Sequence, residues 1–317
     1  MEIDDLREAM GTNPKTGVEL KTVFFSGVEG ISVKMIDYPH NPYKGIFTIA
    51  TSTWGDSIDK WRSVSSQNRF LVVDAVLSGQ ALPTAMESPN FTFAVEGCSR
   101  SAFDQIARSR VGMGFGSMGW RDNDHSDIGF RIPHSIYQNT SKYQKITEVC
   151  LAAKKVYHEL VTEGNENWQD ARSVLPISAI HRFSMVTNYL ALKGFCGNRL
   201  KFCEQADTVA TAWLMREELE KRFPLLALYL RPSCDWGHVC QYHKAYSLSE
   251  AFGCLFKSCG RNPDKSGRDY STFNYSCSDE SLISAQLQIK IPSAVEKLPE
   301  HIWEGLRVTD KILFLED

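Results

Sequence analysis

One stretch in the first third of the chain changes from a strand-type to a helix-type pattern of apolar side chains. Phe91, Phe93 and Val95 alternate with polar or small residues, which is typical of a half-buried β-strand. We predict that Gly97 ends this strand and that Ser99 caps the helix that follows. Paired arginines come next, and then a run with four glycines in eight residues predicts a loop. The stretch is a candidate anion site, and the alternative is an ordinary helix with solvated arginines.

The remaining pattern predicts a mixture of helices and short strands. Residues 143–161 form the clearest amphipathic helix, because apolar residues recur there at helical spacing. Residues 179–195 and 200–222 also predict helices. Short β-rich runs at 23–34 and 46–50 predict strands.

The composition is that of an ordinary globular protein. The chain has 317 residues, 43% of them hydrophobic, and a formal net charge of −3. This charge gives no electrostatic case for a nucleic acid polymer or an anionic membrane as partner, and no apolar run is long enough to span a membrane. Nine widely spaced cysteines fit reduced thiols better than a disulfide framework, and the acidic N-terminus is unlike a secretory signal. We therefore expect a cytoplasmic protein.

The character of the chain changes after Arg231. Cysteine and histidine residues gather there, at Cys234, His238, Cys240, His243, Cys254 and Cys259. Zinc ligation is one interpretation, and buried thiols with incidental histidines are the other, because the spacing lacks a paired Cys-x-x-Cys. We assign no metal site. The change predicts a first domain over residues 1–230 and a C-terminal extension over residues 231–317, of which residues 295–317 are amphipathic and predict a helix and a strand.

No hydrolase or phosphate-loop motif is present: the chain has no Gly-x-Ser-x-Gly, no His-Glu-x-x-His and no Walker loop. Arginines instead recur near the ends of predicted helices, at Arg100, Arg108, Arg110, Arg121, Arg172, Arg182 and Arg199. Arginines accompanied by glutamine and asparagine suit a ligand with a phosphate and an amide-bearing ring. The alternative is that they are solvated side chains on helix surfaces.

Four segments, in one order, resemble the flavin-dependent thymidylate synthases. Residues 87–93 read Glu-Ser-Pro-Asn-Phe-Thr-Phe and are similar to that family's Glu-His-x-x-Phe-Thr-Phe. Residues 96–110 resemble the helix that ends in its Arg-His-Arg signature, and residues 171–176, Ala-Arg-Ser-Val-Leu-Pro, resemble its Ala-Arg-x-x-Leu-Pro segment. The spacing of polar and aromatic residues over 188–205 is similar to that of its C-terminal helices. The resemblance covers residues 70 to about 225.

The resemblance implies both a fold and a chemistry. The fold class would be α+β: a mixed α/β protomer with a small antiparallel sheet and long helices, assembled as a homotetramer with active sites between subunits. The enzyme would use FAD reduced by NADPH, and would transfer a one-carbon unit from methylenetetrahydrofolate to C5 of dUMP. No protein thiol attacks the pyrimidine in this family, so a missing nucleophile motif is expected, and the cofactor carries the hard step.

The resemblance also implies roles for individual residues. Arg199 would be the catalytic residue, because its guanidinium would contact the pyrimidine near N3 and stabilise negative charge there. The implied substrate contacts are Gln105, Arg108, Arg172, Arg199, Ser117 and Arg121. The implied flavin contacts are Thr84, Glu87, Arg108, Ser109, Arg110 and Asn188.

The chain departs from the family pattern at ligand contacts. Ser109 replaces the signature histidine, and Gly194 replaces an asparagine on the flavin side. Without gaps, the signature's glutamate, serine and following arginine fall on Gly116, Met118 and Trp120. A shift of one or two residues restores Ser117 or Arg121, but not the glutamate.

Three hypotheses follow from this combination of matched scaffold and altered contacts. The first is a flavin-dependent thymidylate synthase that acts on dUMP. The second is a relative that methylates or hydroxymethylates another pyrimidine nucleotide, such as UMP or dCMP. The third is a non-catalytic protein that binds flavin or nucleotide on a retained fold.

Overall fold

The computed structural model describes most of the chain before residue 232 and one short segment near the C-terminus. The described residues are 8–12, 19–26, 29–137, 139–200, 204–231 and 306–316. The cysteine and histidine group between residues 234 and 259 lies outside these ranges, so zinc binding there stays a prediction.

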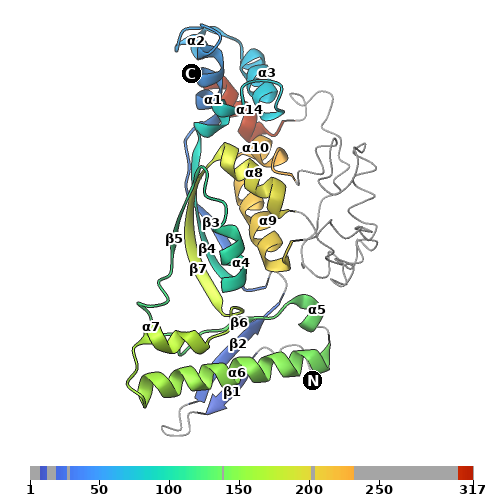
Figure 1. The fold of residues 1–317 in the computed structure, drawn as a ribbon. Helices are drawn as coiled ribbons and strands as arrows, with labels where there is room; N and C mark the ends of the chain where they lie inside the picture. Colours follow the sequence, from blue (N-terminus) through green and yellow to red (C-terminus); the bar gives the residue numbers. More distant parts are fainter. Residues whose placement is uncertain are drawn as a thin grey trace, which may run out of the picture.

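A four-stranded antiparallel sheet forms the centre of the molecule (Figure 1). Its strands, in spatial order, are β3 (Ser32–Asp37), β4 (Asn90–Ser99), β7 (Ile180–Asn188) and β5 (Met113–Ser117). The alternation at Phe91, Phe93 and Val95 is confirmed as part of β4, where these three side chains are at most 1% exposed. All pairings in the sheet join segments that are distant in sequence, so its order cannot be deduced from local patterns.

Gly97 bends β4 rather than ending it, which corrects the prediction. Its φ is 85°, and the pairing of β4 with β7 shifts register at this point. A Cβ atom here would lie 1.7 Å from the carbonyl oxygen of Gly30, an approach that only glycine permits. The strand continues to Ser99, which caps α4 (Arg100–Ile106) as predicted.

Two strands occupy segments for which the sequence predicted other structures. The helix expected over residues 179–195 is wrong in its first half, which forms β7, and α8 (Tyr189–Arg199) begins only after it. Buried and more exposed side chains alternate along β7, which is the period of a strand. The loop expected at the glycine run is also wrong, because its backbone pairs with β7 from Met113 to Ser117. Glycines have no side-chain pattern that would predict this strand.

The strand expected at residues 46–50 is a further error, since these residues lie inside α1 (Pro42–Ser52). Asn41 accepts hydrogen bonds from the backbone of Tyr43 and Lys44, and a proline occupies the first turn. These helix-starting signals outweigh the preference of a few β-branched residues for strands.

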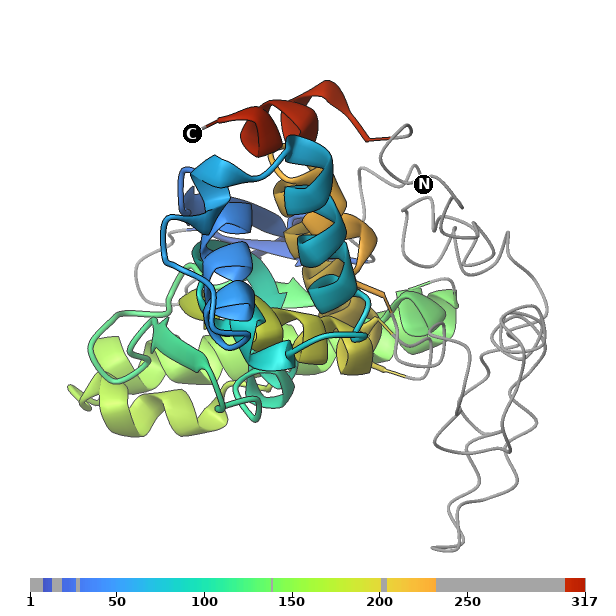
Figure 2. The same ribbon diagram turned by 90° about the horizontal axis from the view of Figure 1, so that it is seen from above.

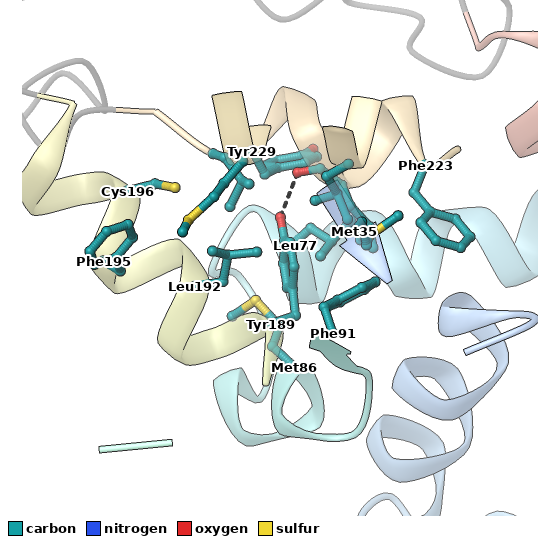
Figure 3. Packing of buried hydrophobic residues seen from close by; sticks show 14 of the residues in the cluster. Met35, Leu77, Met86, Phe91, Tyr189, Leu192, Phe195, Cys196, Phe223 and Tyr229 are labelled. Atoms are coloured by element: carbon teal, nitrogen blue, oxygen red, sulfur yellow. Dashed lines mark hydrogen bonds between the residues drawn. The ribbon is translucent and has the colours of Figure 1, made fainter. Parts of the chain in front are cut away.

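Helices cover one face of the central sheet, as Figure 1 shows. They are α4, α8 and α9 (Ala206–Glu220), followed by α10 (Pro224–Leu228). Figure 3 shows the core between the helices and the sheet, where Phe91 of β4 packs with Tyr189 and Leu192 of α8. The Tyr189 hydroxyl donates to the carbonyl oxygen of Leu226 at 2.7 Å, so this buried polar group is satisfied.

The opposite face of the sheet is left largely open by the described residues. Ile36 of β3 is 52% exposed there and Val186 of β7 is 48% exposed. A sheet with one covered face and long helices confirms the α+β class.

A second layer lies at one end of the sheet. It contains β1 (Glu8–Thr12), β2 (Glu19–Phe25), β6 (Phe130–Arg131), α5 (His134–Tyr137), α6 (Thr140–Thr162) and α7 (Trp168–Ala171). The amphipathic helix predicted over residues 143–161 is confirmed as α6. Its buried residues include Tyr143 and Tyr157, whereas Val149 and Val156 are 62% and 42% exposed.

A helical group lies at the other end of the sheet. It contains α1, α2 (Lys60–Ser63), α3 (Ser66–Leu77) and α14 (Val308–Leu315). Figure 2 shows α14 across this group. Phe314 of α14 is fully buried and stacks on Tyr43 with ring centroids 4.6 Å apart. Thus α14, although it belongs to the predicted C-terminal extension, completes the core of the first domain, and the boundary near residue 230 stays a prediction. Among the described helices, none combines the length and apolar character that a membrane crossing requires.

Candidate functional site

Arg199, the predicted catalytic residue, is held at the C-terminal end of α8 by two neighbouring elements. Its Nη2 donates to the backbone oxygen of Gln105 in α4 at 2.8 Å, and its Nη1 lies 2.6 Å from Oε2 of Glu204. A cation is favourable at a helix C-terminus, where the carbonyl groups lack helical partners. The structure therefore brings together two of the predicted substrate contacts, Gln105 and Arg199.

Gln105 is oriented in turn by Gln205, which precedes α9. The amide Nε2 of Gln105 donates to Gln205 Oε1 at 2.7 Å, and the Ser101 hydroxyl donates to the same oxygen at 3.0 Å. Because its amide nitrogen is engaged, Gln105 keeps its own Oε1 as the acceptor for a ligand. We call Arg199, Gln105, Glu204 and Gln205 the Arg199 cluster. Glu204 was missed by the sequence reasoning, and no motif marks it.

A buried carboxylate beside the cluster connects α9 to the start of α4. Asp207, in the first turn of α9, accepts from both the backbone N–H and the hydroxyl of Ser99. Its Oδ1 has no hydrogen-bond partner among the described residues. Ser99 is also the cap of α4, so the same contact fixes the start of α4 against α9.

The predicted flavin contacts Ser109, Arg110 and Asn188 lie around one loop. Asn188 caps α8 by accepting from Ala191 N at 2.8 Å, and its own N–H donates to the carbonyl oxygen of Gly112 at 3.1 Å. Gly112 has φ of 69°, and a Cβ there would lie 2.7 Å from Asn188 Nδ2. The loop after Arg110 is therefore fixed against Asn188, whose side chain lies close to the loop backbone at Gly112. The Arg110 guanidinium lies over the Phe115 ring at 5.6 Å.

Thr84 and Glu87 lie on a short 3-10 helix, η2 (Pro83–Glu87), and both are exposed. This helix packs against α1, α3 and α8, which places it on the helical side of the sheet with Asn188. Arg108 follows α4 and is exposed, with its backbone N–H donating to Gln105 O at 3.3 Å.

The remaining predicted substrate contacts belong to another part of the molecule. Arg172 donates from Nε to Gln169 O at 3.0 Å. Ser117 is exposed at the end of β5. Among the described residues, the ion pair of Arg121 is with its neighbour Asp122, at 3.4 Å, on the surface. Within the described part of the chain, no hydrogen bond or ion pair joins these three residues to the Arg199 cluster.

A cavity of about 810 Å³ lies where the open face of the sheet meets the loop from Asn123 to Gly129. Its lining includes Gly116, Met118, Arg182 and Ser184. A Cβ added to Gly116 would meet nothing within 4 Å, so the position that aligns with the family's glutamate opens onto free space.

Two histidines beside this cavity were also missed by the sequence reasoning. The indole N–H of Trp120 donates to His181 Nδ1 at 2.9 Å, and the Trp120 carbonyl lies 3.1 Å from His125 Nε2. Burial, followed by the positive charge of Arg100, lowers the pKa of His181 to about 4. Burial is also the main cause that lowers the pKa of His125, and the charges of Arg172 and Arg182 act in the same direction.

Of these two arginines, Arg182 lines the cavity and Arg172 does not, although its charge acts on His125. His125 also lines the cavity, whereas Ser117 and Arg121 do not and only lie near its lining residues Gly116 and Met118 in sequence. We call Arg182, His125, Ser117 and Arg121, together with Arg172, the cavity group. His125 is a single histidine in a polar loop and His181 lies buried in β7, so neither carries a sequence pattern that would have identified it. Among the described residues, no group of three or more His, Cys, Asp or Glu side chains is arranged to hold a metal ion.

Comparisons with known proteins identify the family to which the chain is similar. The family described as thymidylate synthase complementing protein matches residues 34–225. The flavin-dependent thymidylate synthase of Pyrococcus furiosus is 29% identical over 217 residues, which are 66% of this chain and 85% of that protein. That of Sulfurisphaera tokodaii is 31% identical over 210 residues, which are 64% of this chain and 79% of that protein.

A solved structure shares the fold. The UMP/dUMP methylase PolB from Streptomyces cacaoi, bound with 5-Br dUMP, superposes with a TM-score of 0.55 and 18% sequence identity. The match covers 65% of this chain and 95% of that one. At this identity the likeness shows the fold alone.

Proposed function

This chain belongs to the thymidylate synthase complementing protein family, and we propose that it methylates dUMP at C5 as a flavin-dependent thymidylate synthase. FAD is the cofactor of the proposed reaction, NADPH the reductant and methylenetetrahydrofolate the one-carbon donor. The observation that carries the proposal is the Arg199 cluster, in which an arginine and a glutamine are oriented by fixed neighbours within the matched region.

The Arg199 guanidinium supports the chemistry through its charge. Placed against the N3 side of the uracil ring, it stabilises the negative charge that develops as C5 becomes nucleophilic. Gln105 contributes an acceptor oxygen beside it, and Arg108 and Arg172 suit phosphate oxygens, because a guanidinium binds them with two parallel hydrogen bonds. The protein thus binds and polarises the nucleotide, and no side chain has to attack it.

We propose that the flavin binds beside the loop from Ser109 to Met113. Gly112 lacks a side chain where its backbone approaches Asn188, and the backbone oxygen of Gly112 is already engaged by Asn188 N–H. Arg110, Thr84 and Glu87 supply exposed polar groups on the same side of the sheet. When bound, the flavin would supply the hydride that completes the methyl group.

We propose a homotetramer with active sites between subunits, as the family resemblance implies, and the division of the predicted residues supports an active site shared between chains. The Arg199 cluster and the cavity group are not joined by contacts within the described part of one chain, yet both contain proposed substrate contacts. The open face of the sheet, with Ile36 and Val186 about half exposed, is available for association. A neighbouring subunit would bring the two groups together.

A second candidate function is methylation of another pyrimidine nucleotide, such as UMP or dCMP. The specific observation is Gly116, which opens onto the cavity where the family places a glutamate. The additional sugar hydroxyl of UMP, or the amino group on the ring of dCMP, would then enter free space at this position instead of meeting a carboxylate. The third hypothesis, a non-catalytic binder, remains the outcome if ligands bind without turnover.

A cytoplasmic location is part of the proposal. The described cysteines Cys98, Cys150 and Cys196 are buried and free, which supports a reducing compartment.

The function is tested with purified protein by its flavin absorbance and by release of tritium from C5-tritiated dUMP. We expect a yellow protein and tritium release that requires NADPH and methylenetetrahydrofolate. Parallel assays with UMP and dCMP, followed by mass spectrometry of the products, separate the two catalytic hypotheses. A colourless protein that binds no FAD at saturation contradicts both.

A further inference from the structure

Glu204 contacts the proposed catalytic arginine from a position that no sequence motif marks. Its Oε2 lies 2.6 Å from Arg199 Nη1, and the two side chains are 22% and 19% exposed. A charge-assisted hydrogen bond in such a partly covered place is stronger than one between neutral groups and is weakly screened by salt.

Few other contacts fix the tip of Arg199. Its Nη2 donates to the backbone oxygen of Gln105, and its Nε is buried without a hydrogen-bond partner among the described residues. The plane of the guanidinium is therefore set by two contacts, and Glu204 supplies the only charged one that the described residues show.

We infer that Glu204 is a positioning residue that holds Arg199 in the orientation needed for charge stabilisation on the pyrimidine ring. This inference rests on the function proposed above. Glu204 also compensates the positive charge of Arg199, so it weakens the attraction of the site for an anionic nucleotide in the ground state. At the same time it keeps the guanidinium N–H groups directed at the pyrimidine ring, where negative charge develops. Such a pair favours turnover over tight binding.

The kinetic consequence differs from that of structural damage. Loss of Glu204 releases the guanidinium and removes the compensating charge, so kcat falls while KM for the nucleotide also falls. Distortion of the nucleotide site would lower kcat and raise KM, and partial unfolding would lower the apparent kcat and leave KM unchanged. We expect Glu204→Ala to lower kcat about tenfold or more, because small misplacements of a charge-stabilising group are costly. Glu204→Gln retains an oxygen that accepts from Nη1, so it recovers most of kcat.

A matched ion pair on α9 provides the control. Arg216 Nη1 and Glu220 Oε2 are 3.0 Å apart, with side chains 12% and 31% exposed, and neither belongs to the Arg199 cluster. Glu220 Oε1 also lies 3.1 Å from Arg307 Nη2, so Glu220→Ala removes a similarly covered carboxylate from two arginines outside the cluster. We expect it to leave both kcat and KM unchanged.

The experiment is a double-mutant cycle on the full-length chain with FAD. Wild type, Glu204→Ala, Arg199→Ala and the double variant are compared by tritium release and by calorimetric titration with dUMP and UMP. If Glu204 acts through Arg199, its removal tightens nucleotide binding and slows turnover only while Arg199 is present. Urea unfolding confirms that each variant is folded.

Several results would overturn the inference. One is a rise of KM together with the loss of kcat in Glu204→Ala. Another is an equal effect of Glu204→Ala with and without Arg199. A third is an active wild type whose kcat is unchanged by Glu204→Ala, which leaves the proposed function intact. If the wild type binds nucleotides without turnover, the proposed function fails, and the calorimetric titrations alone test the inference. In that case, Glu204→Ala that binds nucleotide no more tightly than the wild type overturns it. A wild type that binds no nucleotide overturns both.

Discussion

The Arg199 cluster and the cavity group both contain proposed substrate contacts, but they are built differently. In the cluster, Arg199 and Gln105 are each fixed by hydrogen bonds of 2.6–2.8 Å to neighbours from other elements. In the cavity group, Ser117 and Arg121 are exposed, and within the described part of the chain Arg121 forms an ion pair with an adjacent aspartate alone. The Arg199 half of the proposed site is organised within the chain, whereas Ser117 and Arg121 in the other half have exposed side chains.

This difference indicates where a second subunit contributes. A side chain that is already fixed loses little conformational entropy when a ligand binds. An exposed arginine loses more, unless contacts from another chain hold it in place beforehand. The open sheet face beside the cavity group is the surface on which a partner would supply those contacts. The comparison therefore predicts unequal consequences of changes on the two sides.

The largest effect is expected for Arg199→Ala. Loss of a preorganised charge-stabilising donor typically costs about 10²–10³-fold in kcat. Arg199→Lys keeps the charge but cannot make both fixed contacts, so we expect little recovery. Rates of tritium release measure both variants, with circular dichroism as the check on folding. Near-normal turnover in Arg199→Ala would remove the cluster from the proposed mechanism.

Mixing two inactive variants tests whether the two groups meet between subunits. Arg199→Ala and Arg172→Ala damage different groups. In co-expressed, doubly tagged assemblies, some sites would combine an intact Arg199 from one subunit with an intact Arg172 from another. We expect such assemblies to regain part of the activity that both parents lack. Mixed oligomers of confirmed composition that stay inactive would instead mean that one chain forms the whole site.

The sequence predicted some elements of the fold better than others, and the reason is physical. Strand β4, the Ser99 cap and α6 follow from local periodicity and capping, and the structure confirms them. β7 was mistaken for a helix, because its apolar residues also fit a helical stripe until the pairing with β4 is known. β5 has too few side chains to show any pattern.

The site residues came from resemblance, which supplies identities but no geometry. Arg199 and Gln105 are 94 positions apart, and their contact depends on the packing of α4 against α8 and α9. Glu204 and the histidines near Trp120 belong to no motif, so only the folded chain identifies them. The helix predicted within residues 295–317 is present as α14, but no local pattern indicated that it packs into the core of the first domain.

Acid should weaken the cavity side of the molecule specifically. The folded-state pKa of His181 is lowered from 6.5 to about 4, so the unfolded chain binds a proton first as pH falls. Its contribution to stability is complete above pH 6.5 and is lost progressively between pH 6.5 and 4. At pH 5 the loss is on the order of 2 kcal/mol. His181→Gln, whose amide oxygen can accept from Trp120, should reduce the difference between urea unfolding at pH 7 and pH 5. An unchanged difference would mean that other groups dominate acid unfolding.

The smallest effect is expected at Gly116, which decides whether the open cavity sets nucleotide choice. A Cβ there meets nothing within 4 Å, so Gly116→Ser and Gly116→Glu should fold normally. If free space admits the extra sugar hydroxyl of UMP, a carboxylate at this position disfavours UMP relative to dUMP by about tenfold in kcat/KM, and the smaller serine does so less. Gly114 is also on β5 with no atom within 4 Å of an added Cβ, but it does not line the cavity, so Gly114→Ser is the matched control. If the ratio of kcat/KM for UMP to that for dUMP is unchanged in Gly116→Glu, the nucleotide sugar lies away from this cavity. The Arg199 cluster alone would then account for the choice between the two nucleotides.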